Sequence, residues 1–168
     1  MNVILTGFMG TGKSSIGRLL AARLGYRFCD LDAVIVEQEG RSINEIFSSA
    51  GEEYFREVES ATLQRILQQA SQVVSTGGGA VIMQKNRDLM RKAGVVVNLV
   101  ASPQSILRRL QNDDQRPLLR DSKSLEQVEK MLLERERFYS EADIRIDTNG
   151  KNVEDVAREI LNHLDRGV

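Results

Sequence analysis

The sequence predicts an α/β protein in which helices cover both faces of a parallel β-sheet. Short apolar runs rich in β-branched residues recur along the chain, and segments with helical periodicity separate them. Strands separated by helices join one sheet in the same direction, because each crossover carries the chain back to the starting edge. The apolar runs are VILT (3–6), YRFC (26–29), VVST (73–76), VVVNLV (95–100) and IRI (144–146).

A glycine-rich loop follows the first expected strand. Residues 7–14 read GFMGTGKS, which matches the phosphate-loop pattern G-x-x-x-x-G-K-[ST], and the helical pattern SSIGRLLAARL follows at once. The backbone N–H groups of such a loop and the positive end of the next helix attract phosphate. A plain glycine turn would explain the glycines, but it would not require Lys13 and Ser14.

We therefore predict a nucleotide site on this loop. Lys13 is expected to bridge the β- and γ-phosphates, and the Ser14 hydroxyl is expected to ligate Mg²⁺. The residues predicted to bind nucleotide here are Gly10, Thr11, Gly12, Lys13, Ser14 and Ser15.

Two aspartates, Asp30 and Asp32, end the second expected strand in the segment CDLDAV. Ligands bind at the carboxyl ends of strands in open α/β sheets, and residues two apart in an extended chain share one face. One carboxylate would support Mg²⁺, and the other would accept the proton of a hydroxyl group that receives phosphate. The alternative is structural, with Asp32 as a helix N-cap and Asp30 as a solvated strand end.

The chain between the second and third expected strands is longer than a crossover needs. We expect several short helices and an acceptor-binding segment over about 32–60, and Ser42 with Glu45 fits a helix start with a capping box. The third strand leads into STGGG, where three glycines would let an acceptor approach backbone N–H groups. A tight turn into the next helix is the alternative.

The rest of the chain continues the alternation. Ser102 with Pro103 predicts one helix start, and Ser124 with Gln127 fits a capping box at another. Between these helices, the polar stretch 111–123 contains a proline and predicts a flexible lid. The third and fourth strands are almost entirely apolar, so we expect them to be central in the sheet.

Composition and charge narrow the class of protein. A chain of 168 residues with 41% hydrophobic composition can bury one core, and we expect a single domain over 1–168. Lys and Arg total 23 against 24 Asp and Glu, so no excess positive charge favours nucleic acid or an anionic membrane. The single cysteine, the lack of a signal-peptide pattern in MNVILTGF and the lack of a long apolar run lead us to expect a cytoplasmic protein.

Seven segments together resemble the shikimate kinase family, in the same order and at similar intervals along almost the whole chain. They are GFMGTGKSSIGRLLA, FCDLD, GRSINEIF, GEEYFREVE, STGGGAV, RPLL and RERFY. The resemblance implies transfer of phosphate from ATP, with Mg²⁺, to the 3-hydroxyl of shikimate, giving shikimate 3-phosphate and ADP on the route to chorismate and aromatic amino acids. It also implies a three-layer P-loop NTPase fold, a five-stranded parallel sheet in the order 2-3-1-4-5, and a monomer.

The resemblance also implies roles for residues on the acceptor side. Asp32 resembles the base that holds shikimate hydroxyls, and Asp30 resembles the carboxylate that supports Mg²⁺ through water. Arg56 and Arg135 resemble the arginines that grip the shikimate carboxylate, which suits paired guanidinium contacts. The glycines that would hold the hydroxyls of shikimate are Gly77, Gly78 and Gly79.

Both arginines have a structural alternative. Each lies in a charged helical segment where ion pairs four residues apart are common, for instance Glu52 with Arg56. Arg137 is two residues from Arg135, so a small shift in the match would exchange the two.

Three more residues are implied on the nucleotide side. Arg116, in QRPLL, resembles a lid arginine that offsets charge on the transferring phosphoryl group, and its alternative is a solvated loop charge. Arg109, next to Arg108, resembles a residue that stacks on adenine. Val153 stands where the family often has a proline against adenine, which is a departure from the pattern.

Two other functions are open from the sequence. A kinase for another small hydroxy acid, such as gluconate, would share the phosphate loop and the two aspartates. A nucleotide-binding module without catalysis would need no base and no lid arginine, so the predicted catalytic residues argue against it. These predicted catalytic residues are Lys13, Asp32 and Arg116.

Overall fold

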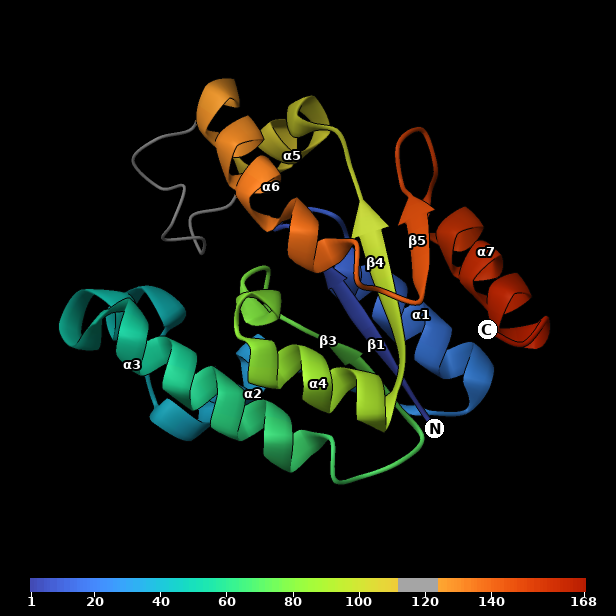
Figure 1. Cartoon of the computed structure of the whole chain (residues 1–168), viewed down its shortest axis with the longest axis horizontal. Coiled ribbons are helices and arrows are strands. Elements are labelled where there is room, and N and C mark those ends of the chain that lie inside the picture. The colour runs from blue at the N-terminus through green and yellow to red at the C-terminus, as the bar shows by residue number, and fades with distance from the viewer. Residues whose placement is uncertain (112–123) are drawn as a thin grey trace.

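Five parallel strands form one sheet in the order β2-β3-β1-β4-β5 in the computed structural model, which describes residues 1–111 and 124–168 (Figure 1). The predicted order is confirmed, and each strand lies within one residue of its expected start and end. β1 is the central strand, with β3 and β4 on either side of it, so both lie in the interior as expected. The strands are β1 (Asn2–Gly7), β2 (Arg27–Asp30), β3 (Gln72–Ser75), β4 (Gly94–Val100) and β5 (Ile144–Asp147).

Helices cover both faces of this sheet, which confirms the three-layer prediction (Figure 1). Val3 and Leu5 of β1 pack with α1 and α7 on one face, whereas Ile4 packs with α2, α3, α4 and α6 on the other. This alternation follows from the two-residue period of a strand. The helices are α1 (Lys13–Leu24), α2 (Leu31–Glu39), α3 (Ile43–Ile66), the 3₁₀ turn η1 (Ala80–Ile82), α4 (Gln84–Ala93), α5 (Pro103–Leu110), α6 (Leu125–Tyr139) and α7 (Val153–Asp165).

Side-chain caps fix where several helices begin. Ser42 accepts the Glu45 N–H while Glu45 accepts the Ser42 N–H, so the predicted capping box is present at α3. Ser102 caps α5 ahead of Pro103, as predicted. Ser124 accepts the N–H of Gln127, which is one half of the box expected at α6.

The segment between β2 and β3 contains α2 and α3, and α3 consists of two helical stretches that meet at a kink at Gly51. This agrees with the expectation of several helices, although the stretch after Gly51 is not short. Gly51 has φ 86° and ψ 169°, a conformation that strongly favours glycine and bends the helix. The start of α3 borders the cavity described below, and side chains on both sides of the interruption pack in the apolar cluster on the sheet.

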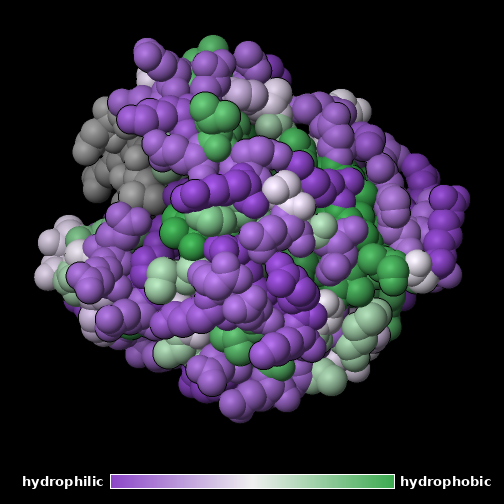
Figure 2. All heavy atoms as spheres, viewed as in Figure 1, coloured by the Kyte–Doolittle hydropathy of each residue, from purple (hydrophilic) through white to green (hydrophobic). Residues whose placement is uncertain are grey.

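Polar side chains cover most of the face of the molecule seen in Figure 2, and hydrophobic side chains gather over β4 and β5. Within residues 1–111 and 124–168, no helix has the length and apolar character needed to cross a lipid bilayer. Most large apolar side chains of this part of the chain lie in the two layers between sheet and helices.

Candidate active site

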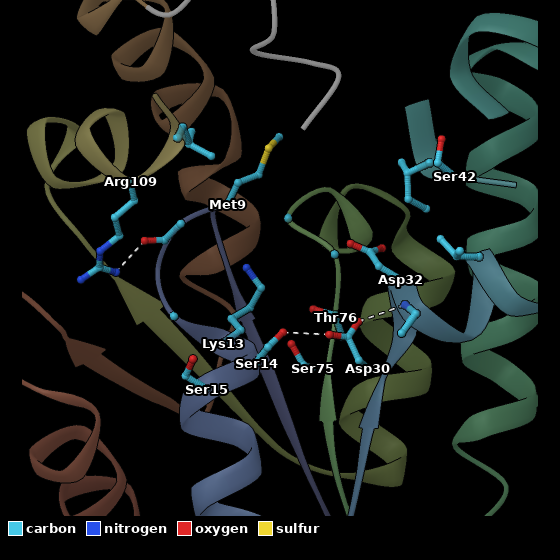
Figure 3. Close-up of a pocket in the computed structure, with 18 residues that line it drawn as sticks. Met9, Lys13, Ser14, Ser15, Asp30, Asp32, Ser42, Ser75, Thr76 and Arg109 are labelled. Carbon is cyan, nitrogen blue, oxygen red and sulfur yellow. Dashed lines mark hydrogen bonds between the residues drawn. The ribbon is translucent and has the colours of Figure 1, made fainter. Parts of the chain in front are cut away.

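A cavity of about 410 Å³ opens at the carboxyl ends of β1, β2 and β3 (Figure 3). The loop after β1 forms one wall, and the opposite wall comes from the end of β2, the start of α2 and the loop after β3. Arg109 of α5 and Ser42, just before α3, lie at its margins. This is the edge at which open α/β sheets bind ligands, and it brings the two predicted glycine loops together.

The loop after β1 has the form of a phosphate cradle. Gly10 and Gly12 have φ of 76° and 88°, which lets the backbone turn tightly into α1. The Lys13 ammonium donates to the carbonyls of Gly7 at 2.7 Å and Phe8 at 2.9 Å, and the Thr11 hydroxyl donates to the Phe8 carbonyl at 2.9 Å. The structure therefore holds the predicted lysine over the loop, at the positive end of α1.

Of the residues predicted for nucleotide binding on this loop, all but the buried Thr11 line the large cavity, and Thr11 lines a smaller neighbouring one. Those in the large cavity are Gly10, Gly12, Lys13, Ser14 and Ser15.

Asp30 and Asp32 both line the cavity, but the expectation that they share one face of an extended strand is wrong. β2 ends at Asp30, whose carboxylate accepts the Ala33 N–H at 3.2 Å and so acts as the N-cap of α2. The helix begins directly after it, because an aspartate cap satisfies an N–H of the first turn. Asp32 therefore lies in the first turn of α2, and Asp30 takes the capping role that the structural alternative gave to Asp32.

The oxygen atoms of Ser14 and Asp30 provide a suitable place for Mg²⁺. The Ser14 hydroxyl donates to Oδ2 of Asp30 at 2.8 Å (Figure 3). Magnesium prefers oxygen ligands and in kinases uses one or two protein groups, with phosphate and water completing the shell. Residues 1–111 and 124–168 contain no group of three or more His, Cys, Asp or Glu side chains arranged for a metal, so an all-protein cage is not offered there. The donor set fits a metal that arrives with a nucleotide.

The triple glycine forms a thin wall against which charged side chains pack. A Cβ at Gly77 would lie 3.0 Å from Oδ1 of Asp32 and 3.0 Å from Oε2 of Glu59. A Cβ at Gly79 would overlap the Arg56 guanidinium. Larger residues at Gly77 or Gly79 would therefore displace the charged groups behind the loop, so these two glycines do more than form a turn.

Arg56 and Arg135 are both buried beside this loop, with relative exposures of 8% and 6%. Nη1 of Arg135 lies 3.4 Å from the position of a Cβ on Gly78, and its guanidinium lies 5.3 Å from the centre of the Phe8 ring. Arg137 is exposed and its guanidinium lies over Phe138 instead. The structure thus brings Arg135, rather than Arg137, to the predicted acceptor loop.

Glu59 is a charged residue of this site that the sequence analysis missed. It is fully buried, and its Oε1 accepts a hydrogen bond from Nη1 of Arg56 at 2.9 Å. Burial raises the pKa of Glu59 to about 7, and the Asp32 charge acts in the same direction, while Arg56 and Arg135 oppose both. A signal was present in the sequence, since Glu59 is four residues from both Phe55 and Leu63 and so shares their buried helix face.

The pair expected from the sequence, Arg56 with Glu52, is also present, but it is the weaker contact of Arg56. Oε1 of Glu52 lies 3.5 Å from Nη2 of Arg56, and the Glu52 side chain is exposed. The buried pair with Glu59 is shorter and is screened from water, so it fixes the guanidinium more firmly.

Two predicted adenine contacts lie together beside the phosphate loop. Nη1 of Arg109 donates to the Gly10 carbonyl at 2.6 Å. Arg109 and Val153, the first residue of α7, both line a second cavity of about 270 Å³ that also includes Thr11. Arg116 and nearly all of the predicted lid, 111–123, lie outside the described residues.

Comparison with known proteins identifies the family. A family model described as shikimate kinase matches residues 9–165. The chain belongs to the shikimate kinase family. This member is 59% identical over 164 residues to a shikimate kinase of Geobacter metallireducens, and the match covers 98% of this chain and 92% of the relative.

Solved structures agree with this assignment. Shikimate kinase from Acinetobacter baumannii, in complex with shikimate, has a TM-score of 0.95 and 35% identity, covering 99% of this chain and 94% of its own. A gluconokinase from Sinorhizobium meliloti has a TM-score of 0.65 and 23% identity, covering 98% of this chain and 91% of its own, and this similarity shows the fold alone. As a member of this family, the protein is an enzyme, a kinase that acts on shikimate with ATP as co-substrate.

Proposed function

We propose that this site transfers the γ-phosphoryl group of ATP to the 3-hydroxyl of shikimate, giving shikimate 3-phosphate and ADP on the route to aromatic amino acids. The observation that carries the proposal is that one and the same cavity has the phosphate loop on one wall and Asp32 with Gly77 and Gly78 on the other. A donor and an acceptor bound on opposite walls would meet between Lys13 and Asp32, which suits a direct transfer between them.

On the donor wall, backbone N–H groups of residues 10–15 and the positive end of α1 hold the phosphates. Lys13 exchanges its contacts with loop carbonyls for contacts with the β- and γ-phosphates, where its charge offsets the negative oxygens. Ser14 and Asp30 would hold Mg²⁺, which would neutralise part of the phosphate charge.

On the acceptor wall, Arg56 and Arg135 bind the shikimate carboxylate, and the glycine loop with Asp32 holds the ring hydroxyls. Asp32 accepts the proton of the 3-hydroxyl as that oxygen forms its bond to the γ-phosphorus. The bond between the γ-phosphorus and the bridging oxygen breaks, and ADP leaves with the electron pair. Glu59 keeps the Arg56 guanidinium in place through their buried hydrogen bond.

We also infer a single domain over 1–168, with an acceptor-binding segment at about 32–60, that works as a monomer in the cytoplasm. The shared sheet supports the single domain, since helices from all parts of the described chain pack on it. Asp32, Ser42 and Ile43 line the cavity and Arg56 lies next to it, which supports the acceptor-binding segment. The lid and the role of Arg116 stay predictions.

A panel of acceptors tests the function. Purified protein is given ATP and Mg²⁺ with shikimate, quinate or gluconate, and ADP release is followed while mass spectrometry identifies the product. We expect kcat/KM for shikimate to exceed the other two by about 100-fold, because buried polar groups are left unpaired by a poorly matched acceptor. A preference for gluconate would overturn the substrate assignment, and ATP binding without acceptor-dependent turnover would instead indicate a nucleotide-binding module.

A further inference from the structure

Tyr139 ends α6 directly behind the acceptor loop, where no role has yet been assigned to it. Its side chain is buried, with 3% relative exposure, and its hydroxyl donates to the Gly78 carbonyl at 2.6 Å. Arg135 lies four residues earlier on the same helix, and side chains with this spacing share one face. The residue therefore touches both an acceptor-loop peptide and the face that carries a predicted substrate-binding arginine.

The three carbonyls of the acceptor loop are held in two different ways. The Gly77 carbonyl accepts from the Ala80 N–H at 3.2 Å, and the Gly79 carbonyl accepts from the Ile82 N–H at 3.1 Å, so both belong to the local turn. The Gly78 carbonyl is held by a side chain from a distant element, 61 residues away in the sequence. The orientation of this middle peptide thus depends on α6.

Fixing the Gly78 carbonyl also fixes the next N–H group. In a trans peptide the C=O and the following N–H point in opposite directions, and the described residues include no cis peptide bond. The Gly79 N–H is therefore aimed away from Tyr139. Within residues 1–111 and 124–168 it donates no hydrogen bond, and its peptide partner Gly78 lines the cavity.

The hydroxyl of Tyr139 is a donor at neutral pH. Burial raises the pKa of Tyr139 to about 12, although the nearby positive charge of Arg135 acts to lower it. The proton that reaches the Gly78 carbonyl is therefore retained over the pH range in which such an enzyme works. The ring itself packs in the apolar cluster between the sheet and α3, α4 and α6.

We propose that Tyr139 is a positioning residue for the acceptor, and that its hydroxyl holds the Gly78–Gly79 peptide, which lies beside Arg135, in the arrangement that binds the acceptor. This inference rests on the proposed function. The ring stabilises the core, and the hydroxyl sets the geometry of the acceptor wall. The donor wall, formed by the loop after β1, has no contact with this hydroxyl among the hydrogen bonds of the described residues.

Tyr139→Phe separates these two contributions, because it keeps the ring and removes only the hydroxyl. We expect KM for shikimate to rise about tenfold, since a buried carbonyl loses its partner and the acceptor peptide loses its orientation. KM for ATP is expected to change less than twofold. Titration calorimetry with shikimate alone, compared with ATP alone, checks the same split without turnover.

Tyr26→Phe is the matched control. The sequence has 3 tyrosines, and Tyr26 packs against the opposite face of the sheet, so the same chemical change there should alter neither KM. Unfolding midpoints of both variants are measured alongside. Parallel increases in both KM values for Tyr139→Phe, or an unchanged KM for shikimate, would overturn the proposal in favour of a purely structural tyrosine.

A double variant adds a second measurement. Because the Gly78 peptide and Arg135 are adjacent and would bind the same acceptor, the fold-change in shikimate KM for Arg135→Lys with Tyr139→Phe should be smaller than the product of the two single fold-changes. Independent effects that multiply would contradict this coupling. Failure of the proposed function looks different, because the wild-type protein itself would then show no shikimate-dependent ADP release.

Discussion

Asp30 and Asp32 are the same chemical group, but their positions give them different tasks. The Asp30 carboxylate accepts a hydrogen bond at each oxygen, from the Ser14 hydroxyl at Oδ2 and from the Ala33 N–H at Oδ1, so both oxygens already have a donor. Asp32 lies two residues later, in the first turn of α2. It lines the cavity, and its Oδ1 faces the acceptor loop at Gly77. We therefore propose that Asp32 accepts the proton from an acceptor hydroxyl.

Asp32→Asn tests this assignment at the residue itself. The amide keeps the size and much of the hydrogen bonding but cannot take the proton, so we expect kcat to fall by about 100- to 1,000-fold with a small change in KM for ATP. Steady-state kinetics with both substrates provides the measurement. Glu37→Gln, an exposed substitution on the same helix, is the matched control and should leave kcat unchanged. Turnover near that of the wild type in Asp32→Asn would rule out the base.

Site residues that belong to a sequence motif could be predicted, whereas residues whose role depends on which helix face is buried could not. The phosphate loop and the two aspartates carry their chemistry in residue type and spacing. Glu59 lies in a charged helical segment, and its spacing from Phe55 and Leu63 indicates the inward face, but only tertiary packing shows that this face buries Glu59 completely. The choice between Arg135 and Arg137 depends on the same information, since two residues differ by about 200° around a helix.

At the scale of elements, turn and cap residues made the boundaries predictable, and the exceptions have local causes. We expected an extended chain through Asp32, but α2 begins at Leu31, because Asp30 caps it. α3 consists of two helical stretches, because the non-helical conformation of Gly51 places a kink between them. Sequence periodicity cannot separate an interrupted helix from two helices, because both have the same apolar spacing.

The acceptor loop as an element is tested by Gly79→Ala. Gly79 has φ −97°, which alanine adopts without strain, but the added Cβ would overlap the Arg56 guanidinium that Glu59 holds in place. We expect KM for shikimate to rise roughly tenfold through the displaced arginine, with KM for ATP unchanged. Kinetics with each substrate varied in turn gives both values.

Gly25→Ala is the control for this substitution and should show the opposite pattern. Gly25 ends α1 with φ 66° and has nothing within 4 Å of an added Cβ, so alanine there strains the backbone without touching the site. It should lower the free energy of unfolding by about 1 kcal/mol and leave both KM values unchanged. If Gly79→Ala lowered the stability without raising KM for shikimate, the triple glycine would have only the structural role of a tight turn.

At the scale of the whole molecule, the site lies where the winding of the sheet changes direction. From β1 the chain crosses over α1 to β2 on one side, and from β3 it crosses over α4 to β4 on the other, with α1 and α4 on opposite faces. Loops on the two sides separate at this point and leave an opening at the carboxyl ends of β1 and β3. The position of the cavity thus follows from strand order, which the resemblance implied. The buried ionic group beneath it follows from packing, which the sequence did not reveal.

That buried group gives the whole fold a pH dependence. The pKa of Glu59 is raised from 4.5 to about 7, so between these pH values the folded protein keeps a proton that the unfolded chain has lost. The contribution of Glu59 to the free energy of unfolding is therefore full below about pH 4.5, falls as pH rises to about 7 by at most about 1.4 kcal/mol per pH unit, and is constant above that. Glu59→Gln removes this titration.

Urea unfolding of both proteins at several pH values provides the measurement. The difference in free energy of unfolding between the wild type and Glu59→Gln should shrink as pH rises, whereas Glu57→Gln, an exposed neighbour, should follow the wild type. Equal pH slopes for wild type and Glu59→Gln would mean that Glu59 is charged in the folded protein throughout this range, with Arg56 outweighing its burial.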